Sequence, residues 1–260
     1  MGLLSEILKY RDLLIMLTFR DIRIRYKQAA MGFVWAIFMP VVAVCAGILI
    51  KKAISVVSGK PMEMVGIISI SVKVLPWTFF VSALKFSVQS LVGNSSLITK
   101  IYFPRAVLPL SSILACIIDF GIALGVLSVL LVIFNVGVSV HLLWLPVLLA
   151  LLILFTTGLG LLLSSANLFF RDVKYVVEII LTFGIFFTPV FYEARAFGEW
   201  EVYLLLNPVG SILENLDKIV VLHQAPDLFW LGYAAACSVA ALTIGLFVFQ
   251  KLEPLFAENI

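Results

Sequence analysis

Charged residues inside long apolar runs are the first candidates for chemistry in this sequence. Asp119 lies near the middle of one such run, and Lys85 lies within another. A carboxylate at the centre of a membrane helix costs about 2.5–3.5 kcal/mol, so such groups usually pair or face water. We expect Lys85 and Asp119 to form an ion pair, and Glu178 and Lys174 belong to the same predicted polar set. A structural ion pair or a group beside a wet cavity is the favoured interpretation, and the proton pathway of an ion-coupled carrier is the alternative.

Catalytic motifs are missing from the sequence. Residues 93–100 come closest to a phosphate-binding loop, but they lack the second glycine before the lysine. No G-x-S-x-G elbow and no H-E-x-x-H helix is present. The cysteines Cys45, Cys116 and Cys237 lie far apart in apolar runs, which argues against a redox or metal role. We therefore predict no catalytic residue, no metal and no cofactor on this chain, so that energy for its work must come from elsewhere.

Aromatic residues are abundant, with 21 Phe, 7 Tyr and 5 Trp. Trp35 and Phe38 lie in the first apolar run, and Phe187 and Tyr192 lie in or just after the fifth. Rings of this kind in a water-filled passage would stack on sugar faces and let a polymer slide. Rings that face lipid or fill a helix bundle would give the same pattern. The sequence leaves both interpretations open.

Long apolar helices must position all of these residues. The chain is 63% hydrophobic and 13% charged, whereas soluble domains carry about 25% charged residues. A spanning helix needs about 20 apolar residues, and the runs are too continuous for an outer-membrane barrel. We predict an all-α membrane protein with six transmembrane helices, at residues 31–50, 65–92, 107–134, 143–167, 176–192 and 228–249.

The second of these runs is the least regular. Lys73, Pro76 and Lys85 interrupt it. Proline lacks a backbone N–H and clashes with the preceding turn of a helix. A break or a partly re-entrant start near Pro76 is therefore an alternative to one continuous span.

The segment before the first run is predicted to form an amphipathic helix at the inner membrane face. Leucine and isoleucine alternate there with charged residues, and a basic stretch at residues 20–27 would attract anionic lipid. More Lys and Arg residues fall on the side that holds both termini than on the other, so both termini are expected to be cytoplasmic. The expected organisation is an interfacial helix at 1–30, a six-span domain at 31–250 and a cytoplasmic tail at 251–260.

The long outer connection at residues 193–227 is predicted to carry helices of its own. Asn207 is an N-cap candidate, and Pro208 suits the first helical position. Apolar residues at helical spacing follow, while Glu214 and Asp217 make the other face polar. We expect this helix to lie in the outer interface, where the connection serves either as a lid or as a packing cap on the bundle.

A series of short motifs runs along nearly the whole chain. They are RDIRIRYK at residues 20–27, GFVWA at 32–36 before Pro40, LPWTFF at 75–80, NSSLITKIYFPR at 94–105, NLFFRD at 167–172 and NP at 207–208. In this order they resemble the bacterial polysaccharide ABC transporter permeases, which export O-antigen, capsule or teichoic-acid polymers. Lys73 departs from the pattern, because the family more often has a small residue before Leu-Pro-Trp.

The resemblance implies partners that supply the missing energy source. It implies a homodimer of this chain in the bacterial inner membrane, bound to two copies of a separate ATPase that holds ATP and Mg. The segment 94–105 would be the coupling helix seated on that ATPase, with Asn94, Lys100 and Arg105 among its contacts. Arg171 and Asp172 in the next inner loop would make the other contact.

The resemblance also implies a passage for a lipid-linked polysaccharide between the two copies. The first and fifth spans would line it, which makes Trp35, Phe38, Phe187 and Tyr192 the expected sugar contacts. The outer helices of residues 193–227 would form the exit gate. The alternatives are an ABC exporter of small lipids or drugs, an ion-coupled secondary carrier and an intramembrane enzyme, of which the last lacks any catalytic motif.

Overall fold

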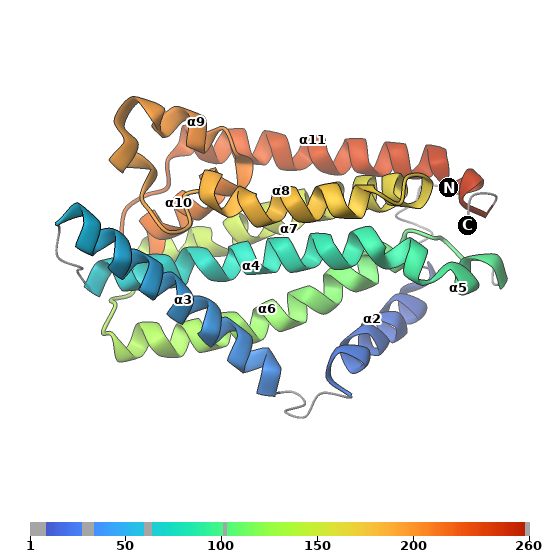
Figure 1. Ribbon diagram of the computed structural model, residues 1–260, viewed down its shortest axis with the longest axis horizontal. Helices are drawn as coiled ribbons and strands as arrows, with labels where there is room; N and C mark the ends of the chain where they lie inside the picture. The colour runs from blue at the N-terminus through green and yellow to red at the C-terminus, as the bar shows by residue number, and fades with distance from the viewer. Residues whose placement is uncertain (1–8, 28–33, 60–63, 101–102, 258–260) are drawn as a thin grey trace.

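The computed structural model describes residues 9–27, 34–59, 64–100 and 103–257, and every regular element in these ranges is a helix (Figure 1). The longer helices are α2 (Arg11–Tyr26), α3 (Val34–Ser58), α4 (Met64–Gly93), α6 (Val107–Ile133), α7 (Leu145–Phe169), α8 (Val173–Phe187), α10 (Pro208–Val220) and α11 (Leu228–Leu252). The short ones are α5 (Ser95–Lys100), α9 (Glu201–Leu205) and the 3-10 turns η1 (Val140–Trp144), η2 (Ala194–Trp200) and η3 (Glu253–Ala257). The prediction of an all-α protein is confirmed.

Five helices of the described chain are long and apolar enough to cross a membrane. They are α3, α4, α6, α7 with its preceding turn, and α11. The predicted fifth span, residues 176–192, is only partly helical, because α8 has 15 residues and ends at Phe187. Thr188 is extended, as expected for a residue before a proline, since the ring of Pro189 disfavours helical backbone there. Five of the six predicted spans are therefore confirmed by length.

The helix α4 forms the centre of the bundle and packs against α3, α6, α7, α8 and α10. It runs through Pro76 without interruption for 30 residues, so the predicted alternative of a break near Pro76 is wrong. Prolines are tolerated inside membrane helices where neighbouring helices support the backbone. Here packed helices on several sides hold the two halves of α4 in one continuous element.

The helices α7 and α11 cross with their backbones in close contact. A Cβ atom on Gly158 would lie 2.3 Å from the backbone carbon of Ala241, and one on Gly245 would lie 2.3 Å from the backbone oxygen of Gly158. Small residues allow membrane helices to approach closely, and this contact permits nothing larger. Gly121 and Gly125 of α6 are four residues apart, as in a small-residue helix-packing motif, but a Cβ at either position would meet no atom within 4 Å.

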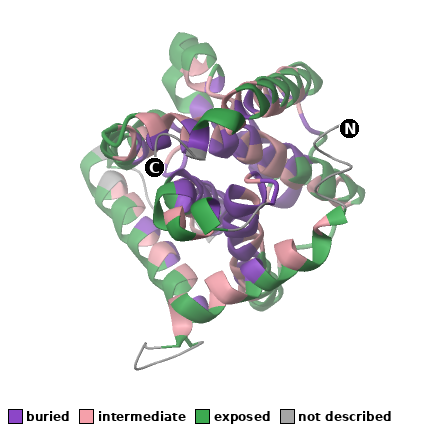
Figure 2. Cartoon of the chain, turned by 90° about the vertical axis from the view of Figure 1, so that its right-hand side faces the viewer, coloured by how far each residue is buried: buried purple, intermediate pink, exposed green. Residues whose placement is uncertain are grey.

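The bundle has two distinct ends. The helix α5, the turn between α7 and α8, and the C-terminal turn η3 share one end, whereas α9 and α10 lie at the other (Figure 1). Viewed onto the first end, buried residues concentrate on the central helices, and exposed residues cover the outer faces (Figure 2). Many exposed residues are large and apolar, such as Val132, Leu143 and Phe247, as expected for a surface that faces lipid.

Candidate functional site

Asp119, the charge at the middle of the third predicted span, is bound by the end of α2. Arg25 donates from Nη1 to Asp119 Oδ2 at 2.7 Å, and Tyr26 donates its hydroxyl to Asp119 Oδ1 at 2.9 Å. Burial, followed by the bond to Asp119, raises the pKa of Tyr26, which keeps the phenol protonated as a donor. The predicted pair between Lys85 and Asp119 is wrong, because α2 supplies the cation instead.

The helix α2 follows α6 rather than lying across it. Asp21 accepts hydrogen bonds from Ser111 at 3.2 Å and from Ser112 at 3.3 Å, and Arg25 reaches Asp119 further along α6. The sequence pattern placed the basic end of this segment at the membrane surface. The structure brings the guanidinium of Arg25 to Asp119, which lies about 18 Å along α6 from Val107 at 1.5 Å per residue.

Lys85 of α4 has a different partner, which lies on α8. Its Nζ atom lies 3.3 Å from Glu178 Oε1 on α8, and the two side chains are 37% and 58% exposed. Gln89 and Lys174 line the same small cleft. The predicted polar set is therefore split, with Lys85, Glu178 and Lys174 together and Asp119 elsewhere. An accessible ion pair on membrane helices normally faces water or another protein surface.

The exposed face of α8 is a continuous apolar surface next to this pair. Its large exposed residues recur at helical spacing and are Tyr175, Val176, Ile179, Ile180, Phe183, Phe186 and Phe187. Phe187 is 72% exposed. Tyr192 lies just beyond the helix and donates its hydroxyl to the carbonyl of Phe186 at 2.8 Å, and its ring contacts that of Phe197 at a tilt of 56°.

The two aromatic residues predicted on the first span lie together on α3. The rings of Trp35 and Phe38 meet edge to face, with their centroids 5.3 Å apart. Trp35 is half-buried, whereas Phe38 is exposed. Of the four predicted sugar contacts, Trp35 meets Phe38, and Tyr192 meets Phe197. Among the described residues, no ring contact joins Trp35 or Phe38 to Phe187 or Tyr192.

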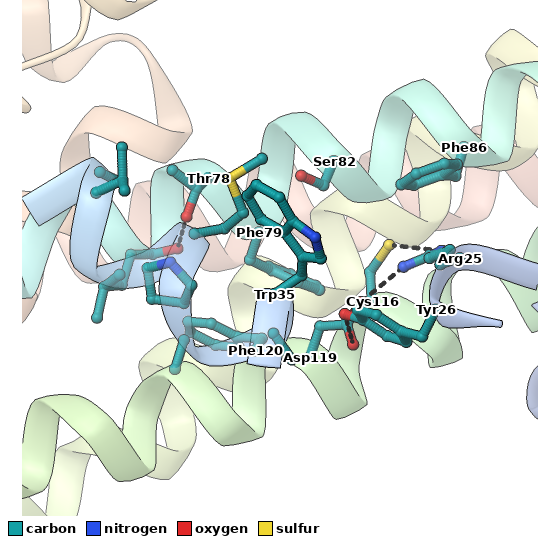
Figure 3. Close-up of a pocket in the computed structure, with 17 residues that line it drawn as sticks. Arg25, Tyr26, Trp35, Thr78, Phe79, Ser82, Phe86, Cys116, Asp119 and Phe120 are labelled. Carbon is teal, nitrogen blue, oxygen red and sulfur yellow. Dashed lines mark hydrogen bonds and ion pairs between the residues drawn. The ribbon is translucent and has the colours of Figure 1, made fainter. Parts of the chain in front are cut away.

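A cavity of about 780 Å³ lies between α2, α3, α4 and α6 (Figure 3). The Arg25–Asp119 pair stands at one end of it, and Trp35 projects into it from α3. The guanidinium of Arg25 also donates to Cys116 Sγ at 3.4 Å and stacks on the ring of Phe86, 3.9 Å from its centroid. No pattern in the sequence indicated this cavity, because its lining comes from four separate segments.

The residues predicted to contact an ATPase all lie at the end of the bundle that holds α5. Lys100, Arg171 and Asp172 are exposed there, and Asn94 is half-buried and donates to the carbonyl of Ser90 at 2.7 Å. Arg105 differs from the others because it is bonded to the C-terminal turn η3. Its backbone N–H donates to Glu253 Oε1 at 2.7 Å, and its guanidinium bonds the Glu253 carbonyl.

The C-terminal turn η3 joins these inner segments into one packed unit. Phe256 is fully buried, with its ring 6.0 Å from that of Phe169 and 5.2 Å from that of Phe249. Together with the Arg105–Glu253 bonds, this places η3 between the start of α6, the end of α7 and the end of α11. The prediction of a simple tail at 251–260 missed this packing, which the apolar Leu255 and Phe256 could have indicated.

The helix α10 is buried and carries an ion pair. Lys73 Nζ of α4 lies 2.8 Å from Glu214 Oε2 and 4.0 Å from Asp217 Oδ2, and only 1% of the lysine side chain is exposed. Lys73 also donates to the carbonyl of Tyr192, while Glu214 accepts from the N–H of Ala194. The expectation that Glu214 and Asp217 give this helix a polar face in the membrane interface is wrong, because both side chains are buried against Lys73, the lysine that interrupts the apolar run of α4.

The start of α10 agrees with the sequence prediction. Asn207 is the N-cap, its side chain accepts from the N–H of Val209 at 3.1 Å, and Pro208 is the first helical residue. The depth of burial of α10 favours the packing-cap interpretation for this helix. By contrast, η2 and α9 expose large aromatic residues, among them Trp200 and Tyr203.

Fold and site together define a multi-pass helical membrane protein, and its described residues include no group of His, Cys, Asp and Glu able to hold a metal ion. Residues 12–221 match the ABC-2 type transporter family. The chain belongs to this family, and the resemblance to polysaccharide ABC transporter permeases is confirmed.

Named relatives align over almost the whole chain. The O-antigen export system permease protein RfbA of Myxococcus xanthus is 29% identical over 263 residues, covering 99% of each chain. The protein of the same name from Klebsiella pneumoniae is 26% identical, over 95% of this chain and 94% of its own. The polysialic acid transport protein KpsM of Escherichia coli is 24% identical, over 90% of this chain and 91% of its own.

Proposed function

We propose that this chain is the transmembrane permease subunit of an ABC exporter that moves a lipid-linked polysaccharide across the bacterial inner membrane. The observation that carries the proposal is full-length similarity to permeases whose names specify O-antigen export. A relative named for polysialic acid transport supports the same substrate class. ATP hydrolysis would occur on a separate subunit, in keeping with the absence of a phosphate-binding loop from this sequence.

Six spans with both termini in the cytoplasm are part of this proposal. The helix α8 runs along α4 from the end that holds α5 toward the end that holds α10 (Figure 1). It is about 22 Å long at 1.5 Å per residue, and the buried residues Thr188 to Phe191 continue it toward the outer end. This geometry supports α8 as a short crossing, the fifth of the six.

A homodimer would cover the polar and apolar surface that α8 exposes. The accessible Lys85–Glu178 pair, which lies next to the apolar face of α8, is unfavourable in a surface that faces lipid. In a dimer the same surface would meet a second copy across a hydrated passage, lined by Phe38 of α3 and by Phe187 and Tyr192, while Trp35 projects into the cavity beside α4. The exposed aromatic residues of η2 and α9 would form the exit gate, while α10 anchors them.

The ATPase would dock on the inner end of the bundle. Lys100, Arg171 and Asp172 are exposed there and available to a partner, and Asn94 begins the short helix that carries Lys100. Arg105 would act within the chain by holding η3. Charge reversal at Lys100 or Arg171 is therefore a cleaner test of docking than charge reversal at Arg105.

Reconstitution with its ATPase tests the proposal. Vesicles that contain this chain, the ATPase encoded beside it and a lipid-linked glycan should export the glycan when ATP is added. A matched preparation with a hydrolysis-deficient ATPase should not. Export without the ATPase, or ATP hydrolysis by this chain alone, would contradict the assignment, and export of small lipids but no glycan would favour the small-molecule exporter.

The ion-coupled carrier remains testable on the same vesicles. In that alternative Asp119 would take up and release protons, whereas here Arg25 and Tyr26 both bind its carboxylate. Asp119→Asn should therefore leave ATP-driven export dependent on ATP and insensitive to a proton gradient. Transport driven by a proton gradient alone, and lost in Asp119→Asn, would establish the carrier.

A further inference from the structure

The cavity between α2, α3, α4 and α6 exists because α3 contacts α4 along only part of its length. At the outer part the helices touch, since a Cβ atom on Gly47 would lie 2.5 Å from Ile70 and 3.3 Å from Val74. Toward its beginning α3 leaves α4, and Trp35, Met39 and Pro40 line the space of about 780 Å³ that opens between them. This volume falls within the range of about 300–1,000 Å³ that is typical of ligand sites.

The walls of the cavity are mainly apolar and aromatic. Phe79 and Phe86 of α4 and Phe120 of α6 line it together with Trp35 of α3 (Figure 3). Met39 of α3 also lines it. Met39 is 60% exposed and Phe86 is 45% exposed, so the cavity opens to the surface of the described chain. Its mouth therefore lies on the side of the bundle and not at one of its ends.

The depth of the cavity determines what can fill it. Phe120 lies near the middle of the 27-residue helix α6, about 20 Å from Val107 at 1.5 Å per residue, and so at the level of the hydrocarbon core. The apolar walls of the cavity offer water no hydrogen-bond partners at this depth. A cavity that opens sideways at this depth is instead in contact with the hydrocarbon chains of the bilayer.

One end of the cavity is polar. Arg25 makes three hydrogen bonds there, to Asp119, Ser112 and Cys116, and a guanidinium has more N–H groups than these contacts use. The polar end therefore retains donors for an oxygen-rich group, while the remaining wall suits methylene groups.

We propose that this cavity binds one long hydrocarbon chain of a membrane amphiphile, with the polar group of that molecule at the Arg25 end. A phospholipid of the bilayer and a polyprenyl phosphate share this chemistry. The first source does not depend on the proposed function. The second rests on it, since a polyprenyl phosphate would be the lipid anchor of the exported glycan.

Photolabelling tests the site. The detergent-purified chain is incubated with a phosphatidylglycerol that carries a diazirine on one acyl chain, irradiated and mapped by mass spectrometry. Labels should concentrate on peptides that contain Trp35, Phe86 and Phe120. Labels spread evenly over lipid-facing peptides, such as the one that contains Val129, would overturn the proposal without any variant.

Two tryptophan variants provide a matched comparison. Ser82→Trp places a large ring inside the cavity, whereas Val129→Trp places it on an exposed position of α6. Cavity labelling should fall by about tenfold or more, equivalent to about 1.4 kcal/mol, in Ser82→Trp and stay unchanged in Val129→Trp. Equal labelling in both folded variants would overturn the site, and Ser82→Leu replaces Ser82→Trp if the latter does not fold.

Competition separates the two sources. Excess unlabelled polyprenyl phosphate that removes the label would assign the site to the lipid anchor, and removal by unlabelled phospholipid alone would assign it to a bilayer lipid. Failure to remove the label with either would contradict a defined site. If labelling is specific but the vesicles export no glycan, the lipid site stands and the proposed function fails.

Discussion

The buried ion pair between α4 and α10 leads to the sharpest prediction. Lys73→Met removes the ammonium group that lies 2.8 Å from Glu214 and 4.0 Å from Asp217, and it keeps an apolar side chain of similar length. Both carboxylates then remain buried, without the lysine that faces them. Removing one partner of a buried pair costs about 3–5 kcal/mol, because it leaves an uncompensated charge in a poorly solvated site.

The same substitution at Lys85 is the matched control. Lys85 lies on the same helix and is also paired, but 37% of its side chain and 58% of that of Glu178 are exposed. Exposed pairs contribute about 0–1 kcal/mol. In a chain of this size 1 kcal/mol corresponds to a change in melting temperature of about 2–4 °C. Lys73→Met should therefore melt roughly 6–20 °C lower than the natural chain, and Lys85→Met no more than about 4 °C lower.

Thermal unfolding in detergent, followed by size-exclusion chromatography, measures this difference. The double variant Lys73→Met/Glu214→Gln should recover much of the loss, because it removes one buried charge while the introduced glutamine can still accept from the N–H of Ala194. Equal melting temperatures for Lys73→Met and Lys85→Met would refute the argument from burial. A double variant as unstable as Lys73→Met would refute the argument from uncompensated charge.

Three further predictions concern other contacts. Burial raises the pKa of Asp217, so its contribution to stability is complete below the ordinary Asp pKa and is lost as pH rises through the raised pKa. Asp217→Asn should remove this pH dependence and should melt at or above the temperature of the natural chain near neutral pH. Melting curves recorded from acid to neutral pH measure both effects. Asn207→Ala should lower stability by about 0.5–2 kcal/mol through loss of the N-cap, which the same melting assay detects, and an unchanged melting temperature would contradict the capping role. Gly158→Ala should force α7 away from α11, because its Cβ would lie 2.3 Å from the backbone of Ala241. Overpacking of this kind costs about 1–3 kcal/mol, so the variant should melt at a lower temperature. Gly232→Ala is the control and should melt like the natural chain, because its new Cβ would have no atom within 4 Å.

The sequence predicted the helices more accurately than the contacts between them. The third and sixth runs, expected at residues 107–134 and 228–249, correspond to α6 and α11 within a few residues. The start of α10 at Pro208 was predicted from its cap alone. These features depend on hydrophobic length and on local backbone hydrogen bonds, which neighbouring residues determine.

The ion pairs could not be predicted in the same way. Lys85 and Asp119 were natural partners by sequence because both lie within apolar runs, yet they project from different faces of the bundle. Arg25 was assigned to the membrane surface with no partner on the chain. Its contact with Asp119 could not be predicted, because it depends on how α2 packs on α6. Which charges meet is determined by helix rotation and register, and these follow from packing between distant segments.

The sequence by itself determined that this chain is a helical membrane protein, that it carries none of the catalytic motifs sought in it, and that its motifs match polysaccharide permeases. These properties follow from apolar run lengths and from motif order, both of which are local along the chain. Only the tertiary structure decided that Lys73 neutralises α10, that η3 packs between inner segments, and that α3 leaves a cavity beside α4. Each of these joins residues far apart in sequence, since burial of charge and filling of space depend on the whole bundle.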